Sequence, residues 1–440
     1  MVLNRGKKVA DVATADTDND QLVGWITGAR GDDVPMSFLW GVATSGHQTE
    51  GGNSDSDTWF AEHVTPTVFR EPSGPACDAF HRWRDDLDLV AGMGLTAYRF
   101  SVEWARVEPV EGSFSAAALD HYAAIVDRCV ELGLAPVVTF NHMTCPHWFA
   151  ARGAWLDPGS ASLFARYCGV VMDRFGASIS HAVTLNEPNL PRLLSWIPLP
   201  AEVRELERAT LDAAGKAAGV GRYRLTNVVL PEEFDAMEEG QAVAHVAARE
   251  AIKSRRPDLP VGLSIAVVDD QAVGSTDIRD HKRSEVYGRW LRSAAEDDFI
   301  GVQNYERARY DGDGPLPPPS GAVLNQLGSD IYPPSLGNAV RYVHAEAGVP
   351  VFVTEHGIAT EDDSRRAAFL EPALAGLREA IDDGVPVLGY LHWTLLDNFE
   401  WIFGYGPKLG LVEVDRQSFA RTPKASAAEY ARIVRAASGG

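Results

Sequence analysis

The chain has 440 residues, of which 45% are hydrophobic and 23% are charged, a composition that excludes a largely disordered protein. With 40 Lys and Arg against 61 Asp and Glu, its formal net charge is −21 at pH 7. Such a surface repels phosphate backbones and anionic lipids, so we expect a small-molecule ligand rather than nucleic acid or a membrane. The sequence has no apolar run long enough to cross a membrane and no apolar secretory segment at its start, which predicts a cytoplasmic protein.

The cysteines are too few for a disulfide framework in a chain of this length, so we expect reduced thiols. They are Cys77, Cys129, Cys145 and Cys168. Cys145 lies between His142 and His147, but Pro146 and the irregular spacing leave no helical face on which these side chains converge. We therefore predict no metal site.

The chain begins with a polar, acidic segment. Residues 1–35 show no hydrophobic period, so we predict a flexible N-terminal arm there, followed by a single domain over 36–440. Within that domain, short apolar runs rich in β-branched and aromatic residues alternate with longer amphipathic stretches. This alternation is typical of buried parallel strands joined by helices.

Eight apolar runs are candidate strands, and eight is the number that closes a parallel barrel. They are Phe38–Ala43, Leu95–Ser101, Leu134–Phe140, Ala182–Asn186, Val261–Ala266, Phe299–Gln303, Val351–Glu355 and Val387–Trp393. The candidate helices are Asp85–Gly92, Ala116–Leu132, Ser160–Phe175, Glu239–Ser254 and Arg365–Asp383. We expect an α/β fold, a single (β/α)8 TIM barrel. Two stretches near 188–238 and 306–335 exceed simple barrel connections, and we predict long loops there that shape a pocket.

Barrel enzymes carry their reactive groups at the C-terminal ends of the strands. The polar or aromatic residues at or just past these ends are Gln48, Arg99, His142, Asn186, Glu187, Tyr305, Glu355 and Trp393. Glu187 and Glu355 each directly follow a β-rich run, on the fourth and seventh strands, which lie on nearly opposite walls of such a barrel. A single terminal Glu usually caps a helix or meets a surface Lys, but two at matching places indicate a paired acid and nucleophile.

Five motifs, in this order over about residues 38–430, resemble the signatures of family 1 glycoside hydrolases. They are Phe-Leu-Trp-Gly-Val-Ala-Thr-Ser-Gly-His-Gln-Thr-Glu-Gly (38–51), Tyr-Arg-Phe-Ser (98–101), Thr-Leu-Asn-Glu-Pro (184–188), Thr-Glu-His-Gly (354–357) and Trp-Thr-Leu-Leu-Asp-Asn-Phe-Glu-Trp (393–401). Together the motifs are highly specific. The resemblance implies a retaining β-glycosidase, which hydrolyses β-D-glucosides or related β-glycosides through a covalent glycosyl–enzyme ester and uses no metal or organic cofactor.

The resemblance also implies a role for each residue at a matching position. Glu187 matches the acid/base and Glu355 the nucleophile, while Arg99 and Tyr305 match residues that keep the nucleophile charged and oriented. The sugar subsite is lined by Gln48, His142, Glu400 and Trp401, by Asn186, which also belongs to the catalytic set, and by Trp393 as a ring face beneath the pyranose. The two carboxyls need opposite protonation at one pH, so their environments have to separate their pKa values.

The chain departs from the usual family letters at several positions. Gln303 stands where an Asn is common, Met143 replaces an aromatic residue, and His356 replaces the frequent Asn after the nucleophile. The glycine-rich segment that usually follows Asn-Glu-Pro is also absent, and residues 191–224, with an apolar stretch at 193–197, take its place. This segment fits either a partly apolar aglycone site or a contact in a homo-oligomer.

Two other functions use the same residues. A transglycosidase employs the same carboxyls but transfers the sugar to an alcohol or sugar acceptor. A catalytically silent sugar-binding barrel is less consistent with the sequence, because both Glu187 and Glu355 are present. Gln48, Glu400 and Trp401 are compatible with gluco, galacto and fuco forms of the sugar.

Overall fold

The computed structural model describes residues 2–4, 7–10, 38–197 and 200–438. The chain divides into two units, residues 1–38 and 39–440. In the first unit, β1 (Val2–Asn4) pairs antiparallel with β2 (Lys7–Ala10). The rest of the predicted arm lies outside the described residues, so its flexibility stays a prediction. All the features below belong to the second unit.

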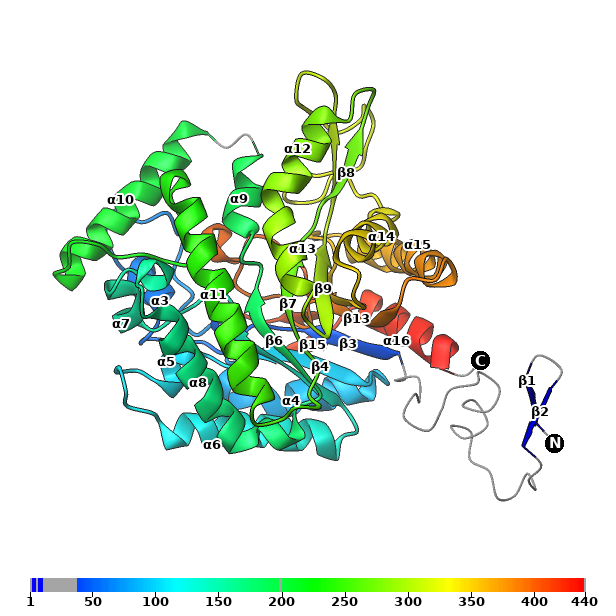
Figure 1. Cartoon of the computed structure of the whole chain (residues 1–440), viewed down its shortest axis with the longest axis horizontal. Helices are drawn as coiled ribbons and strands as arrows, with labels where there is room; N and C mark the ends of the chain where they lie inside the picture. Colours follow the sequence, from blue (N-terminus) through cyan, green and yellow to red (C-terminus); the bar gives the residue numbers. More distant parts are fainter. Residues whose placement is uncertain (1, 5–6, 11–37, 198–199, 439–440) are drawn as a thin grey trace. The chain divides into compact units, whose positions relative to one another are not determined.

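Eight parallel strands close into a barrel (Figure 1). In chain order they are β3 (Leu39–Ala43), β4 (Ala97–Ser101), β5 (Ala135–Asn141), β6 (His181–Asn186), β7 (Val261–Ala266), β9 (Phe299–Asn304), β12 (Val351–His356) and β13 (Val387–Trp393). Each strand pairs with the next in this order, and β13 closes the ring against β3. The predicted (β/α)8 fold is confirmed, and each predicted strand matches an observed one to within two residues at either end.

Apolar side chains fill the interior of the barrel. One buried cluster contains Ala97, Val137, Val183, Phe299, Phe352 and Leu391, which come from different strands. Neighbouring strands approach so closely that a Cβ on Gly301 of β9 would lie 2.1 Å from Ser264 Oγ of β7. Glycine is therefore required there by space alone. Since the interior is a packed core, polar chemistry is confined to the strand ends.

Several outer helices coincide with predicted segments. They are α4 (Ala79–Gly92), α6 (Ala116–Glu131), α8 (Ser160–Phe175), α11 (Phe234–Lys253) and α15 (Asp363–Asp382). Helices α8 and α11 lie side by side on the outside of the barrel (Figure 1). Helices α4 and α11 begin earlier than predicted, because the early aromatic rings of Trp83 and Phe234 are buried, and this packing offsets their weak helix preference.

Other helices occupy segments for which the sequence analysis predicts none. They are α10 (Ala201–Ala218), α12 (Asp277–Val286), α13 (Gly288–Ala294), α14 (Ser335–Ala347) and α16 (Ala425–Ser438). In α14 the buried residues Leu336, Val340, Val343 and Ala347 recur at helical spacing, so the signal is present in the sequence. Helix α10 is capped by the following residue, Gly219, whose φ of +71° suits a residue without a Cβ.

The two long connections are only partly irregular. Residues 188–238 contain α9 (Leu190–Ser195), α10, the 3-10 turn η4 (Pro231–Glu233) and the start of α11. The prediction of a loop is therefore wrong for most of this stretch, because helix-favouring residues dominate 201–218. In the second stretch, β10 (Arg307–Tyr310) and β11 (Pro315–Leu316) join β8 (Asp269–Ala272) in a small sheet.

Short elements complete the fold around the strand ends. They are α2 (Gly46–Thr49), α3 (Asp57–Glu62), α5 (Trp104–Val107), α7 (His147–Ala151), η2 (Ala154–Leu156), η3 (Gly176–Ser178), η5 (Trp401–Phe403), β14 (Val412–Val414) and β15 (Arg421–Pro423). Among the described residues, no helix is both long and apolar enough to span a membrane.

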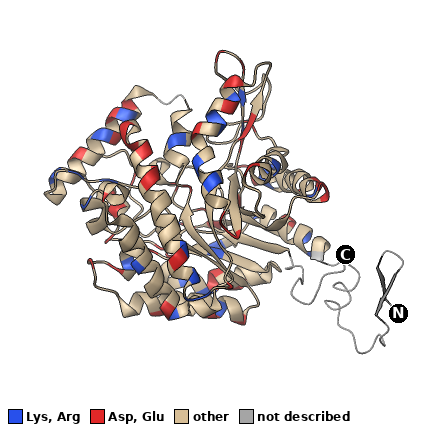
Figure 2. Cartoon of the chain, viewed as in Figure 1, with Lys and Arg blue, Asp and Glu red and all other residues tan. Residues whose placement is uncertain are grey.

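Charged residues lie mainly on the outer helices, whereas the barrel strands carry almost none (Figure 2). In the eight barrel strands, all of which the structure describes, Arg99 of β4 and Glu355 of β12 are the only Lys, Arg, Asp or Glu residues. Arg99 is 0% exposed and Glu355 is 3% exposed. Because a buried charge is costly unless it is paired, these two residues mark the functional end of the barrel.

Candidate active site

The side chains expected to form the site meet at the C-terminal ends of the barrel strands. They are Gln48 on α2, Arg99 in β4, His142 after β5, Asn186 and Glu187 at the end of β6, Tyr305 after β9, Glu355 in β12, Trp393 in β13, and Glu400 and Trp401 in the following loop. All of them are buried or half-buried. Direct contacts join many of them, and electrostatic interactions with Glu355 link Glu187 and Glu400 to the same site.

Three side chains hold the carboxylate of Glu355. Arg99 Nη1 donates to Glu355 Oε1 at 2.6 Å, and the Tyr305 hydroxyl donates to Oε2, also at 2.6 Å. Gln303 Nε2 donates to Oε1 at 2.9 Å. Hydrogen bonds of this kind, one of them from a cation, favour the ionised carboxylate. These contacts therefore orient Glu355 and favour its charged form, as a nucleophile requires.

A second row of contacts passes through Asn186. Its Oδ1 accepts from Arg99 Nη2 and, at 2.6 Å, from Gln303 Nε2. Its Nδ2 lies 3.2 Å from His142 Nε2. Burial and the charge of Arg99 lower the pKa of His142 well below its usual value, so the ring is neutral and its Nε2 can accept from the amide. Asn186 thus connects the Arg99–Glu355 pair to the aromatic side of the site.

Glu187 lies in a different environment. Its backbone N–H donates to Ser264 O at 2.8 Å. Its φ of +48° is in the left-handed region, which residues with a side chain rarely occupy and which is enriched at functional sites. Among the described residues, no side chain donates a hydrogen bond to its carboxyl group. In the described part of the chain, Glu187 therefore lacks hydrogen bonds like those by which Arg99 and Tyr305 stabilise the charged form of Glu355.

The two carboxyl groups differ in how their pKa values are set. Burial raises the pKa of Glu187 well above its usual value, and the charges of Glu355 and Glu400 add to the rise, against a lowering by Arg99. Burial also raises the pKa of Glu355, but Arg99 and Tyr305 lower it by charge and by direct hydrogen bonds. Glu187 therefore keeps its proton to a higher pH than Glu355, so one can be an acid while the other is an anion.

Gln48 and Glu400 form a polar pair in the same site. Gln48 Nε2 donates to Glu400 Oε2 at 3.1 Å and to Phe399 O at 2.8 Å, while its Oε1 accepts from Ser45 Oγ at 2.7 Å. Burial and the charge of Glu355 raise the pKa of Glu400 to about 8, against a lowering by Gln48. The pair presents donors and acceptors side by side, which is the chemistry that recognises neighbouring hydroxyl groups.

Nearly parallel rings line the site. The ring of His142 lies 5.6 Å from that of Trp393 with 17° between their planes, and 6.2 Å from that of Trp401 with 15°. The Trp401 ring also lies 5.7 Å from the His47 ring, with 4° between their planes. The polarised C–H groups of a sugar can pack on such faces much as cations do. The aromatic residues expected in the sugar subsite are therefore together, and their contact with a sugar stays a prediction.

The residues that differ from the usual family motifs differ in whether they contact the site. Gln303 reaches both Asn186 and Glu355, so the longer amide still orients the carboxylate. His356 packs away from that carboxylate, because its Nδ1 lies 2.9 Å from the Tyr390 hydroxyl and its ring stacks on Phe369 at 5.0 Å. His356 therefore packs between β12 and α15 and makes its contacts outside the site.

Two residues with contacts in the site have no role in the sequence analysis. Thr139 Oγ1 of β5 accepts from Arg99 Nε at 3.0 Å, and His47 packs against Trp401. The sequence does indicate a possible role for His47, because this residue lies inside the motif that carries Gln48. It gives no such indication for Thr139, because a Thr in a buried strand is usually a core residue. The described residues contain no group of three or more His, Cys, Asp or Glu arranged to hold a metal ion.

Comparisons with known proteins agree with this geometry. A model of glycosyl hydrolase family 1 matches residues 31–200 and 322–438. Among curated proteins, β-glucosidase A of Thermotoga maritima is 28% identical over 91% of this chain and 97% of its own length. A bifunctional β-D-glucosidase/β-D-fucosidase of Bifidobacterium breve is 29% identical over 91% of this chain and 98% of its own.

Two solved structures are similar over nearly the whole chain. The β-glycosidase BGL167 is 48% identical, with a TM-score of 0.85, and the match covers 92% of this chain and 97% of that one. The apo form of a β-glucosidase is 42% identical, with a TM-score of 0.87 and coverage of 91% and 98%. Since the family model also matches well over half of the sequence, the chain belongs to glycosyl hydrolase family 1.

Proposed function

We propose that the protein is a retaining β-glycosidase that hydrolyses β-D-glucosides and related β-glycosides by double displacement. The observation that carries this proposal is the asymmetry of the two carboxyl groups. Glu355 accepts hydrogen bonds from Arg99, Tyr305 and Gln303, whereas the half-buried Glu187 has no such partner in the described part of the chain and holds its proton more strongly. This is the division of labour that a nucleophile and a general acid require.

In the first step, a carboxylate oxygen of Glu355 attacks the anomeric carbon while Glu187 gives its proton to the glycosidic oxygen. The bond between the anomeric carbon and that oxygen breaks, the aglycone leaves as a neutral alcohol, and a glycosyl ester forms on Glu355. Arg99 and Tyr305 hold the attacking carboxylate in line by the hydrogen bonds that they already make. Direct attack calls for carboxyl groups about 5–5.5 Å apart.

In the second step, Glu187, now a carboxylate, takes a proton from a water molecule. The water oxygen attacks the anomeric carbon, the ester bond breaks, and Glu355 is released as a carboxylate. The free sugar has the configuration of the substrate, because the anomeric carbon has been inverted twice. Both residues return to their starting protonation states. The displacement as written uses neither a metal ion nor an organic cofactor.

The names of the relatives support glucosides as the first substrates to test. The Thermotoga maritima and Bifidobacterium breve proteins are both named β-glucosidases, and the second is also named a β-D-fucosidase. D-Glucose and D-fucose differ in the direction of the C4 hydroxyl, and D-fucose lacks the hydroxyl at C6. A pair such as Gln48 and Glu400, which offers several donors and acceptors, is suited to these positions.

We also propose a partly apolar aglycone site on the side of α9, which begins three residues after Glu187. The ring of Trp196 rests edge-on against His281 and Tyr310, at 5.7 Å and 6.3 Å. Ile197 beside it is 40% exposed. An aryl or alkyl aglycone can pack on such a surface, and a contact between protomers is the alternative that an oligomeric-state measurement would reveal.

Replacing Arg99 by Met removes the cation that faces Glu355. The pKa of Glu355 should then rise, and since the nucleophile has to be ionised, the acid limb of the pH–rate profile should move to higher pH. Leaving Glu355 buried without its partner should also reduce the free energy of unfolding by about 3–5 kcal/mol. The kcat/KM of an aryl β-glucoside as a function of pH measures the first effect, and a urea titration measures the second.

A second buried ion pair provides the control. Arg421 makes two hydrogen bonds to Asp86, at 2.8 Å and 3.0 Å, away from the site residues. Arg421→Met should destabilise the fold while leaving the acid limb where it is in the wild type. If Arg99→Met shows the wild-type acid limb, then Arg99 does not set the protonation of Glu355.

The proposed function is tested by trapping the covalent ester. A glucoside with fluorine in place of the C2 hydroxyl and a dinitrophenolate leaving group should react once, since fluorine destabilises both transition states and the leaving group accelerates only the first. We expect the intact protein to gain the mass of one fluorosugar, and the peptide that contains Glu355 to carry it.

Glu355→Gln is the matched control and should gain no mass. Proton NMR during hydrolysis of an aryl β-glucoside should show the β-anomer of the free sugar first. The α-anomer as first product would overturn retention. If the wild type neither gains mass nor releases the aryl group from any sugar of a panel, the protein is instead a silent sugar-binding barrel.

A further inference from the structure

A buried ion pair lies next to the aromatic wall of the sugar subsite. His47 Nε2 on α2 is 2.9 Å from Glu62 Oε1 on α3, and both side chains are 0% exposed. The imidazole plane is within 4° of the indole plane of Trp401, with ring centroids 5.7 Å apart. The same ring meets Phe399 edge-on at 6.0 Å. His47 therefore contacts Glu62 at one edge and Trp401 through its ring.

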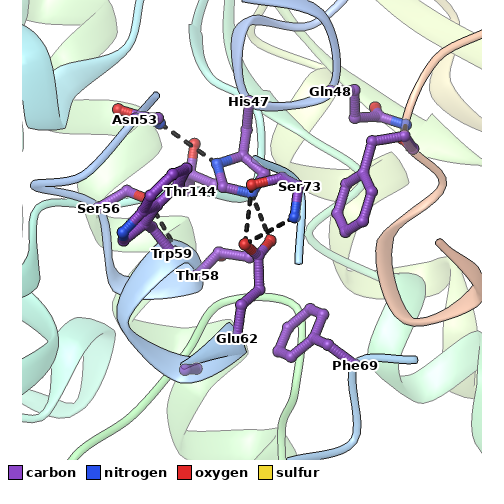
Figure 3. A network of polar contacts seen from close by, with 12 residues as sticks. His47, Gln48, Asn53, Ser56, Thr58, Trp59, Glu62, Phe69, Ser73 and Thr144 are labelled. Carbon is purple, nitrogen blue, oxygen red and sulfur yellow. Dashed lines mark hydrogen bonds and ion pairs between the residues drawn. The ribbon is translucent and has the colours of Figure 1, made fainter. Parts of the chain in front are cut away.

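The pair is fixed by further hydrogen bonds (Figure 3). Glu62 Oε2 accepts from both the backbone N–H and the hydroxyl of Ser73, at 2.9 Å and 2.8 Å. On the other side of the ring, Asn53 Nδ2 is 3.4 Å from His47 Nδ1 and donates to Glu103 Oε2 at 2.8 Å. The contact at Nε2 is thus fixed through Glu62, which is itself tied to the segment of Ser73, while Asn53 beside Nδ1 is tied to Glu103.

The surroundings favour the charged form of His47. Burial lowers the pKa of His47, but the carboxylates of Glu62, Glu103 and Asp57 outweigh this effect, so that the pKa is raised. These are the ionisable groups that face the ring, from α3 and from the turn after β4, while Phe399 and Trp401 face it from the loop after β13. An imidazolium against an indole face gains a cation–π attraction that a neutral ring lacks.

Trp401 needs such support. Its φ of +48° is in the left-handed region, where a residue with a side chain is strained. It follows Glu400 directly, whose carboxyl bonds to Gln48, and Gln48 follows His47 directly. The imidazole is therefore joined through one peptide unit to Gln48 and through ring contact to Trp401. A shift of His47 would move the groups on both sides of the expected hydroxyl-binding positions.

We propose that the His47–Glu62 ion pair is a positioning device that holds the Trp401 ring and the neighbouring Gln48–Glu400 pair in register, and so determines sugar affinity and epimer preference. The inference rests on the proposed β-glycosidase function and deepens it. Epimers differ only in the direction of one hydroxyl, so discrimination depends on sub-ångström placement of the recognising groups. A buried pair in which both Glu62 oxygens are engaged, one by His47 and the other by Ser73, fixes one arrangement.

Two near-isosteric variants separate the ring from the charge. His47→Gln removes the ring but keeps an N–H donor for Glu62, and Glu62→Gln keeps the ring and a hydrogen bond but removes the counter-charge. For His47→Gln we expect KM of an aryl β-glucoside to rise about tenfold with a kcat change below about threefold, and the ratio of kcat/KM between glucoside and galactoside to change.

The effect of Glu62→Gln is measured as the pH dependence of KM. In the wild type, KM should rise as pH increases through the raised pKa of His47, because the imidazolium is then lost. Without the carboxylate of Glu62 the pKa of His47 falls, so the rise in KM should begin at lower pH. His47→Gln should lack the part of the pH dependence that comes from His47, while a step from Glu400, whose pKa is raised to about 8, should remain. A residue with a purely structural role would change neither the position of the His47 step nor the epimer ratio.

The matched control is the buried pair of His245 and Asp297, whose Nε2 and Oδ2 are 3.2 Å apart and whose side chains are each 1% exposed. Asp297→Asn should alter stability but leave KM, its pH dependence and the epimer ratio as in the wild type. If a single variant does not fold, the double variant His47→Gln with Glu62→Gln removes both buried charges together and serves for the same comparison.

Folded variants with wild-type KM, pH dependence and epimer ratio would overturn the positioning role. The same holds if Asp297→Asn reproduces the changes seen in the His47 and Glu62 variants. Wild-type turnover of the glucoside, measured in the same assay, shows that the proposed function holds, so a missing effect in an active enzyme counts against His47 alone.

Discussion

Glu355→Ala should lose turnover of an aryl β-glucoside by about 10⁵-fold or more, since no ester can form without the attacking carboxylate. Arg99, Tyr305 and Gln303 would then surround an empty position, lined by donors that suit a small anion. Azide should therefore restore part of the rate and yield an α-glucosyl azide, because the anomeric carbon is inverted once while Glu187 still protonates the leaving group. Chromophore release and NMR of the azide product measure both effects.

Two controls accompany this variant. Glu413 on β14 is exposed and makes no contact with the site residues, so Glu413→Ala should keep the wild-type rate. Azide should have no effect on the wild type, in which Glu355 fills the position. Residual activity of Glu355→Ala near that of the wild type, or a β-glucosyl azide as the rescued product, would contradict the assignment of Glu355 as the nucleophile.

Glu187→Ala should make the rate depend steeply on the leaving group. General acid catalysis contributes about 10²–10⁴-fold, and that contribution is needed only when the leaving oxygen is basic. We expect the turnover of an alkyl or unactivated aryl β-glucoside to fall by this factor. A dinitrophenyl β-glucoside should form the ester at nearly the wild-type rate. A series of aryl β-glucosides with leaving groups of graded basicity measures the slope.

The pH dependence of Glu187→Ala provides an independent check. Burial and the charges of Glu355 and Glu400 raise the pKa of Glu187 well above its usual value, and its protonated form is the active one. Wild-type kcat/KM should therefore fall as pH rises through that pKa, and this basic limb should be absent in Glu187→Ala. The acid limb, which reports Glu355, should persist. An unchanged basic limb would assign the acid to another residue.

The sequence predicts the barrel because each strand is a short apolar run with a polar residue at its end. A strand buried on both faces cannot exchange these residues for polar ones, so the pattern survives in the local sequence. Predicted and observed strand ends agree to within two residues. Helix α14 carries an equally clear pattern, with Leu336, Val340 and Val343 on its buried face, so its local sequence also indicates an amphipathic helix.

The prediction of a loop after Glu187 is wrong for most of that stretch. The usual glycine-rich segment is absent there, and the family model has no match over 201–321. In the structure α10 occupies 201–218, with Leu211 and Ala214 packed in a cluster that also holds Tyr223 and Phe399. These contacts join segments far apart in the chain. A local pattern can indicate an amphipathic helix, but the partner of its apolar face is set only by the fold.

For the site, the sequence by itself determined which residues stand at the strand ends and, through the family motifs, which two carboxyls we expect to carry the chemistry. The tertiary structure decided their environments. Arg99 and Glu355 are 256 positions apart in the sequence, but Arg99 Nη1 lies 2.6 Å from Glu355 Oε1. In the same way, His47 of the His47–Glu62 pair stacks on Trp401, which lies near the other end of the chain. The pKa of a buried carboxyl depends on desolvation and on charges within a few ångströms. Those distances come from closing the barrel, which brings distant strand ends together, and no local sequence pattern encodes them.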